Sequence, residues 1–425
     1  MPRPPIRHTR VVQRAWTSPA LRATVALALS GGAFALGNLI LARVLPKEEY
    51  GRFSLGLAIV MIGILTGPLG AQIIVNRHRT DPGRRLLART LSTSGLVGLV
   101  LTIGAGALYP LDLLLLAAML AAIIGGACNL VVVGHYQSRQ RYGRSLLVFA
   151  STNLSLLATG IAAAVFRPTV ALAPAAIFAT CVWASPLFAW WKLLRNRAAI
   201  DSPDPPYPWG EALAVVGTIG AGMLLGATER LVIPRALSLS DLATFSVLAT
   251  LAGSPFQMLN QGVGFALLPR LRGARNRTAR RRVLSQELLI VVGACALLGV
   301  MVWWLTPIVL HFFLVGRYVL PTHLILAAIA VGALRPLGAV AIAVVNAVGS
   351  AGELIALGGI SWIASALGLW GAWVGVRWGL TGLVYGVGLG WMFRAAAAGV
   401  LAFRSMQRAE AASQVEESLV TLVAE

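Results

Sequence analysis

The sequence has little charge. Of its 425 residues, 12% are Asp, Glu, Lys or Arg and 57% are hydrophobic, with a mean hydropathy of +0.78. Soluble domains carry about 25% charged residues. The apolar runs are too long and too numerous for a polar surface to cover, which excludes an ordinary soluble domain.

Cysteine and histidine are also scarce, and the motifs of several enzyme classes are missing. Cys128, Cys181 and Cys295 lie in apolar runs and their number is odd, so no disulfide framework is expected. The sequence has no HExxH motif or Cys/His cluster for a metal. It has no GxxxxGK[ST] loop, so the chain is not an ATP-driven pump by itself. We therefore expect no enzyme, no metal site and no cofactor.

Acidic residues are the scarcest charged group. Lys and Arg number 35 and Asp and Glu 15, a net charge of +20, and only Lys47 and Lys192 are lysines. A basic protein can bind nucleic acid. Here the basic residues occupy alternate loops between apolar runs, as they do in membrane proteins. No nucleic-acid partner is expected.

What the chain does have is a series of apolar runs of about 20 residues, the length that spans a bilayer. These runs predict an all-α polytopic membrane protein with about twelve transmembrane helices in two pseudo-symmetric six-helix lobes. The expected spans are 22–45, 53–75, 86–108, 113–133, 146–166, 170–191, 211–237, 242–268, 286–310, 320–345, 353–375 and 379–402.

The charge of the loops predicts the orientation. The segment at 76–89 has five arginines and the one at 270–282 has seven, whereas PKEEYGR at 46–52 and the other intervening loops are short and carry few. Arginine-rich loops stay cytoplasmic. We expect a multi-pass protein of the bacterial cytoplasmic membrane with both termini cytoplasmic. The basic N-terminal segment has no small-residue cleavage site, so it is interpreted as an arm, not a signal peptide.

A proline-rich stretch divides the spans into six and six, a layout common in transporters built from repeats. At an offset of 192 residues, RVLPKEEYGRFSLGLAIV aligns with RALSLSDLATFSVLATLA, which favours a duplication. The predicted organisation is a basic arm at 1–21, an N-terminal lobe at 22–194, a linker at 195–210, a C-terminal lobe at 211–402 and a cytoplasmic tail at 403–425.

Five of the charged residues inside the predicted spans are candidates for the site. They are Arg43, Glu229, Arg230, Arg335 and Arg394. An arginine facing lipid costs about 2.5–3.5 kcal/mol on the lenient insertion scale, so we expect the four arginines to face a shared, hydrated interior. Arginine binds phosphate through its planar fork, which predicts a cationic cavity with an anionic ligand. Arg43 and Arg394 could instead snorkel from near the span ends.

Three neighbouring residues complete the predicted cavity. Asn38 shares a face with Arg43 only approximately, and it is expected to line the cavity. Glu229 is expected to pair with an arginine, with proton coupling as the alternative role. Pro234 lacks an N–H, so the carbonyl of Arg230 loses its helical partner. We therefore expect a break in this helix on the cavity side.

Two stretches resemble a known family. GNLILARVLPKEEYGRFSLGLAIVMIGILTGPLG is similar to the opening of Wzx-type polysaccharide flippases, which belong to the multidrug/oligosaccharidyl-lipid/polysaccharide exporter superfamily. The matching residues are Leu45, Glu49, Tyr50, Gly51 and Phe53. ATERLVIPRALSLSDLATFSVLATL is similar to the family's seventh helix, with Glu229 where Asp is usual.

The resemblance implies a flippase that moves a polyprenyl-diphosphate-linked saccharide from the inner to the outer leaflet by alternating access. Such a protein serves cell-surface polysaccharide biosynthesis. Its implied partners are the lipid-linked saccharide and membrane lipids. A polysaccharide polymerase and glycosyltransferases are further candidate partners.

Other classes stay open. A major-facilitator transporter shares the layout, and R-H-R-T-D-P-G-R-R at 77–85 partly matches its loop motif. A drug/cation antiporter would need more buried acids than Glu229. A membrane glycosyltransferase could use Glu48 and Glu49, but it would need a large external domain. A non-transporting scaffold of a polysaccharide assembly complex is the remaining alternative.

Overall fold

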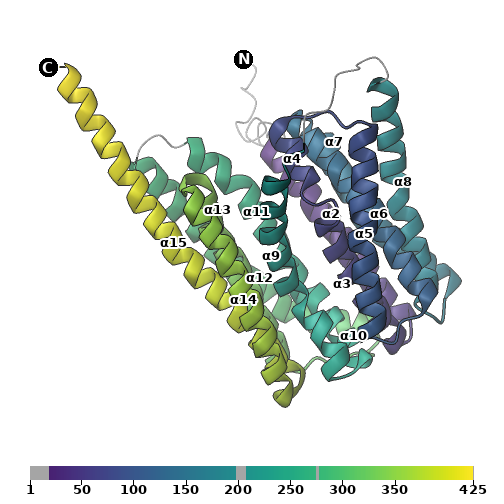
Figure 1. Ribbon diagram of the computed structural model, residues 1–425. Coiled ribbons are helices and arrows are strands. Elements are labelled where there is room, and N and C mark those ends of the chain that lie inside the picture. The colour runs from purple at the N-terminus through teal and green to yellow at the C-terminus, as the bar shows by residue number, and fades with distance from the viewer. Residues whose placement is uncertain (1–18, 198–206, 274–276, 425) are drawn as a thin grey trace, which may run out of the picture.

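The computed structural model describes residues 19–197, 207–273 and 277–424, and every element within these ranges is a helix (Figure 1). The first half comprises α2 (Pro19–Val44), α3 (Lys47–Thr66), α4 (Ala71–His78), α5 (Arg84–Leu108), α6 (Leu113–Ser138), α7 (Tyr142–Phe166) and α8 (Leu172–Arg197).

The second half follows a similar plan. It comprises α9 (Trp209–Ala236), α10 (Leu239–Leu248), η1 (Ala249–Gly253), α11 (Ser254–Gly273), α12 (Arg277–Ile308), η2 (Val309–Phe313), α13 (Thr322–Val348), α14 (Ala351–Gly375), η3 (Val376–Trp378) and α15 (Gly379–Ala424). In Figure 1 the two halves lie side by side, with α9 and α10 next to the first half.

The apolar helices confirm the predicted all-α polytopic fold. Ten stretches of the described chain are long and apolar enough to cross a membrane, and Ala28–Val44 is a shorter apolar helix. The last of the ten, Ala351–Arg408, contains both α14 and most of α15. The count of twelve spans stays a prediction.

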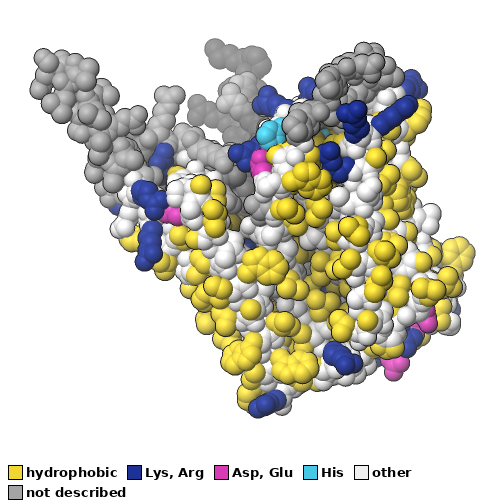
Figure 2. All heavy atoms as spheres, in the orientation of Figure 1, with side chains coloured by type: hydrophobic (Ala, Val, Ile, Leu, Met, Phe, Trp, Pro, Cys, Tyr) yellow, Lys and Arg dark blue, Asp and Glu magenta, His cyan; other side chains and the backbone are white. Residues whose placement is uncertain are grey.

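Basic side chains gather at one end of the helices, which we call the arginine-rich end. There α4 ends in Arg77 and His78, and α5 begins with Arg84 and Arg85. Figure 2 shows hydrophobic side chains over the flank and most of the visible Lys and Arg at this end. This distribution follows from the predicted alternation of arginine-rich and arginine-poor loops, because every second loop lies on the same side of the membrane.

Helix ends follow the offset found in the sequence. Val44 ends α2 and Ala236 ends α9, 192 positions later; Lys47 begins α3 and Leu239 begins α10 at the same separation. The two halves therefore share their register here, although their side chains differ.

The helices α3 and α10 cross where the two halves meet. Ser54 and Ser246, 192 positions apart, hydrogen-bond to each other through their hydroxyls at 2.5 Å. The crossing is close because Gly51 has no side chain; the carbonyl of Leu239 occupies the space that a Cβ would take. A contact between equivalent residues places the pseudo-twofold axis between these two serines.

Two tyrosines connect the halves reciprocally at the end opposite the arginines. Tyr109, which follows α5, donates a hydrogen bond to the carbonyl of Leu231 on α9 at 2.7 Å. Tyr318, in the loop after η2, donates to the carbonyl of Ala42 on α2 at 3.0 Å. Each half thus reaches from the loop after its third span to the first helix of the other half.

The predicted break at Pro234 is wrong. Helix α9 continues through Pro234 to Ala236. Pro234 lies in the last turn of α9, which ends two residues later at Ala236. The missing N–H of Pro234 removes one hydrogen bond close to a helix end, where carbonyl groups lack helical partners in any case, so it does not break the helix.

The second half is instead interrupted in its next span, at η1. Pro255 has no N–H to bond the carbonyl of Leu251, so the chain widens by one residue. The N–H of Ser254 accordingly bonds the carbonyl of Ala249, five residues earlier. Pro255 is visible in the sequence, but the sequence alone does not show that Pro255 interrupts its helix whereas Pro234 does not.

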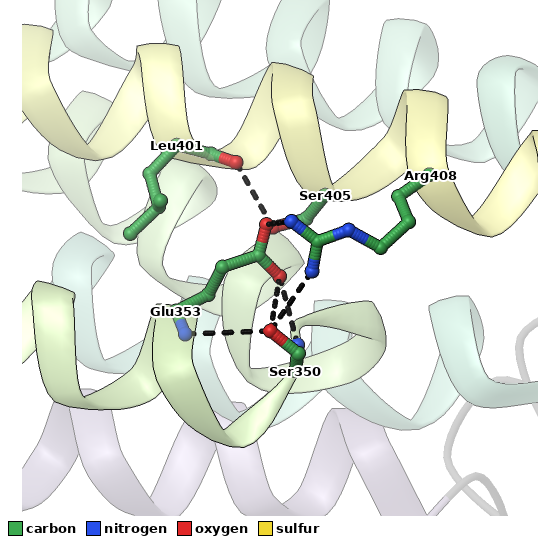
Figure 3. A network of polar contacts seen from close by, with 5 residues as sticks. All are labelled: Ser350, Glu353, Leu401, Ser405 and Arg408. Carbon is green, nitrogen blue, oxygen red and sulfur yellow. Dashed lines mark hydrogen bonds and ion pairs between the residues drawn. The ribbon is translucent and has the colours of Figure 1, made fainter.

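The helices α14 and α15 are tied together at the arginine-rich end (Figure 3). Ser350 and Glu353 form a reciprocal capping box at the start of α14. Arg408 reaches across from α15, with Nη2 3.0 Å from Glu353 Oε1 and Nη1 donating to Ser350 Oγ at 2.9 Å. The segment expected as a tail from residue 403 therefore begins as part of α15, which continues to Ala424.

The described end of the predicted linker packs on the first half, whereas residues 198–206 lie outside the described ranges. The Tyr207 hydroxyl donates to the carbonyl of Leu69 at 2.9 Å, and the Arg89 guanidinium lies 4.4 Å from the Tyr207 ring centre. Arg77 pairs with Glu211 at 2.6 Å. The start of α9 is thus fixed to helices of the first half.

Candidate functional site

One face of α9 combines small residues with an acid. Gly222, Gly226 and Glu229 are spaced i, i+4 and i+7, so they lie along one side of the helix. Glu229 is 2% exposed. A buried carboxylate needs a charged partner, and α13 supplies it.

The partner of Glu229 is Arg335, directly before Pro336 on α13. Arg335 Nη2 lies 3.7 Å from Glu229 Oε1, and the arginine side chain is 17% exposed. This distance is an ion pair, but it is too long for a direct hydrogen bond. The predicted pairing of Glu229 with an arginine therefore joins two helices that are about a hundred residues apart in sequence.

Helix α15 brings a tryptophan and a second arginine to the same place. Trp391 and Arg394 are three residues apart and share a helix face. The Cζ atoms of Arg335 and Arg394 lie 4.8 Å and 5.6 Å from the Trp391 ring centre. A desolvated cation–π contact is worth about 2 kcal/mol, so the indole holds both guanidinium groups together.

The glycines of α9 make room for this group. A Cβ at Gly222 would lie 3.3 Å from Nη2 of Arg394, which is tighter than most real contacts. A Cβ at Gly226 would lie 4.0 Å from Cζ2 of Trp391. Larger side chains on this face of α9 would push the arginine and the indole away.

Four buried N–H groups of these residues lack a hydrogen-bond partner in the part of the chain that the structure describes. They are the Nε atoms of Arg230, Arg335 and Arg394 and the Nε1 atom of Trp391. An unsatisfied buried donor costs about 1–3 kcal/mol. The site therefore offers donors in excess of the acceptors around it.

Arg230 lies on α9 next to Glu229 but also interacts with the first half. Its charge interacts with Glu229, with Arg335 and with the hydroxyl of Tyr50 on α3. The cluster of Glu229, Arg230, Arg335 and Arg394 has three cations and one anion, which leaves a positive excess.

Two predicted site residues are placed elsewhere. Arg43 is exposed in the last turn of α2, with its Cζ atom 5.6 Å from the Phe313 ring centre. Asn38 is buried, and its side-chain amide donates to the carbonyl of Phe34 in its own helix at 3.1 Å. The structure thus brings Arg335 and Arg394 together with Glu229, whereas Arg43 faces the surface.

Sequence reasoning missed Trp391, Gly222 and Gly226. The signal was available for the tryptophan, because Trp391 shares a face with Arg394. Tryptophan in an apolar helix usually indicates the membrane interface, and glycine usually indicates close helix packing. In the residues that the structure describes, no group of three His, Cys, Asp or Glu could hold a metal ion.

Comparisons with solved structures identify the fold. An inward-facing multidrug resistance MATE family transporter of the MOP superfamily matches with a TM-score of 0.61 at 14% identity, over 91% of this chain and 95% of that chain. The lipid II flippase MurJ in an inward closed conformation matches with a TM-score of 0.62 at 11% identity, over 95% and 93%.

An outward-facing MATE family transporter matches less well, with a TM-score of 0.55 at 14% identity over 91% of this chain and 96% of that chain. No protein-family model and no curated protein matches the sequence. The chain therefore has the polytopic membrane fold shared by MATE transporters and MurJ, at identities that show the fold alone.

Proposed function

We propose that the protein is a transporter that flips a polyprenyl-diphosphate-linked saccharide across the cytoplasmic membrane by alternating access. The observation that carries the proposal is the pair Arg335 and Arg394, held at one indole inside an apolar helix bundle, with Glu229 as the acid beside them. Buried charges of this kind are expensive and are retained where they contact a substrate.

The chemistry of the site favours an anionic cargo. Two guanidinium groups can each offer a planar pair of donors to phosphate oxygens. A diphosphate and a polar saccharide need such a path, whereas the polyprenyl chain can stay in the lipid. The Wzx-type resemblance of the sequence and the fold shared with a lipid II flippase support this class of substrate.

The contacts between the halves support alternating access. Ser54 and Ser246 meet on the pseudo-twofold axis, and Tyr109 and Tyr318 bridge the halves at the end away from the arginines. If the arginine-rich end is cytoplasmic, these contacts close the outer side. Closure of the outer side is expected of an inward-facing state, and one MATE family transporter above was solved in such a state.

Transport by reconstituted protein tests the proposal. Arg335→Gln and Arg394→Gln should each slow the flipping of a fluorescent polyprenyl-diphosphate saccharide in proteoliposomes by tenfold or more, because each removes a charge-assisted contact worth about 1.5–3 kcal/mol. Arg377→Gln is the matched control, since Arg377 is exposed in η3.

Flipping at the wild-type rate by both variants would contradict the proposal. A cation/drug antiporter would give a different pattern: export of a cationic dye that is lost in Glu229→Gln and retained in Arg335→Gln. That pattern would replace the flippase with the antiporter as the function of this fold.

A further inference from the structure

The indole N–H of Trp391 has no acceptor in the part of the protein described, although Nε1 is buried. The same holds for the Nε atoms of the two arginines beside its ring, Arg335 and Arg394. Three N–H donors without acceptors, grouped around one side chain of an apolar bundle, cost about 1–3 kcal/mol each. Native proteins rarely retain such groups without a ligand, ion or water to satisfy them.

Glu229 does not satisfy these donors. Its carboxylate approaches Arg335 through Nη2, at 3.7 Å, and leaves the Nε of that arginine without a partner. The ion pair balances charge but fills no donor position at Trp391. An anion that carries several oxygen atoms would supply acceptors to several of these donors at once.

The glycine face of α9 lies directly against the indole and the Arg394 guanidinium. The Cζ2 atom of Trp391, adjacent to the ring carbon that bears Nε1, lies 4.0 Å from where a Cβ of Gly226 would be. The Nη2 atom of Arg394 lies similarly close to Gly222. The ring atom next to the N–H-bearing carbon thus faces a part of α9 that carries no side chain.

We propose that Trp391 binds the substrate directly: its indole N–H donates a hydrogen bond to a phosphate oxygen, while its ring holds Arg335 and Arg394 in position for the same diphosphate. The inference rests on the proposed function and adds a neutral donor to a site predicted only from charge.

This arrangement selects among anions. A carboxylate has two oxygens and could engage one guanidinium fork. A diphosphate carries more oxygens, over a longer group, and can accept from both arginines and from the indole together. Two like charges converging on one ring also repel each other, so a dianion between them stabilises the site more than a monoanion does.

Binding of inorganic pyrophosphate to the purified full-length chain in detergent micelles tests the proposal without transport. Trp391→Phe keeps an aromatic ring over which the arginines can lie but removes the N–H, so pyrophosphate affinity should fall by about tenfold. Trp391→Leu also removes the ring and should lower the affinity further. Trp370→Phe is the control, because Trp370 is 62% exposed on α14.

Affinity unchanged in Trp391→Phe would overturn the direct hydrogen bond. Equal losses in the Phe and Leu variants would overturn the positioning role of the ring. Thermal unfolding of each variant shows whether it is folded. A second measurement uses the wild-type chain: among the indole N–H signals of its 12 tryptophans in an ¹⁵N NMR spectrum, one must shift on addition of pyrophosphate. No shift in any of them would also overturn the proposal.

The outcomes separate this inference from the proposed function. Pyrophosphate binding that depends on Trp391 in a protein that flips no lipid-linked saccharide would support the anion site and reject the flippase. Flipping that is unaffected by Trp391→Phe would support the flippase and reject the direct role of the indole.

Discussion

At the scale of single residues, the site depends on the balance between Glu229 and the arginines. The carboxylate lies 3.7 Å from Arg335, so it stands close to the position that an anionic ligand would take at that guanidinium. A substrate anion and Glu229 therefore compete for Arg335. Under the proposed function, this competition would keep the arginine neutralised between transport cycles and would weaken the final binding of the anion.

We expect Glu229→Gln to bind pyrophosphate several-fold more tightly than the wild type, because the competing charge is gone. Without ligand the variant should unfold at a lower temperature, since a buried arginine has lost its partner. Pyrophosphate should then raise its unfolding temperature more than it raises that of the wild type. Weaker pyrophosphate binding by Glu229→Gln would mean that the carboxylate helps the anion bind instead of competing with it.

Much of this residue-level arrangement was predictable. The cost of charge in a membrane indicated Arg335, Arg394 and Glu229 as site residues. Arg43 was selected by the same rule, but it is near the end of α2, where a long side chain reaches the surface. Helical periodicity shows which residues share a face of one helix but not which faces of different helices meet. The sequence therefore could not show that Trp391 contacts two arginines.

At the scale of elements, α9 is the helix on which the site is built. Gly222 and Gly226 have no side chains, and this leaves room beside α9 for the long side chains of Arg394 and Trp391 on α15. The predicted break at Pro234 was not needed, because the absence of side chains opens the surface of the helix without opening its backbone.

We expect Gly222→Val to reduce pyrophosphate affinity by about tenfold or more, because the new side chain takes the space of the Arg394 guanidinium. Gly210→Val is the matched control on the same helix, since a Cβ at Gly210 meets no atom within 4 Å. Titration of both variants in micelles measures the difference. Equal affinities would show that Arg394 can move aside without loss.

At the scale of the whole molecule, the two halves have helix ends at equivalent positions, but the side chains at these positions differ in charge. The positions 192 residues before Glu229 and Arg230 are Gly37 and Asn38. Gly37 packs directly on α7, where a Cβ would meet the carbonyl of Leu156 at 2.7 Å. In the first half, α2 packs against α7 at the position where α9 of the second half carries Glu229 and Arg230. The charged cluster of the candidate site therefore has no counterpart in the first half.

The serine pair on the pseudo-twofold axis permits a test of the whole-molecule motion. In a background without Cys128, Cys181 and Cys295, which are free thiols, the double variant Ser54→Cys/Ser246→Cys should form a disulfide under oxidation. The cross-link should stop flipping, because the two halves can no longer separate at α3 and α10. Reduction should restore it, as measured in the same proteoliposomes.

Each single-cysteine variant is the control and should flip at the same rate with and without oxidant. Undiminished flipping by the fully cross-linked double variant would show that α3 and α10 stay together throughout the cycle. Alternating access by separation of the two halves at this crossing would then be excluded.

The whole-molecule plan was the most predictable level. Apolar run length, loop charge and the offset of 192 gave the helices and the repeat, because each depends on local composition. The contacts across the halves, such as Tyr318 with Ala42, join residues far apart in sequence. No local pattern encodes them, and only the folded chain shows them.

The two reciprocal tyrosines have a consequence for the energy source of transport. Burial raises the pKa of Tyr318 from 10 to about 12 and raises that of Tyr109 in the same direction. A raised pKa means that the contribution of the protonated phenol is fully present below pH 10 and is lost only as the pH rises from there through the folded-state value. Across the physiological range both hydroxyls stay donors. The two tyrosine hydrogen bonds between the halves therefore do not respond to a proton gradient. If such a gradient drives transport, it must act on other titratable groups.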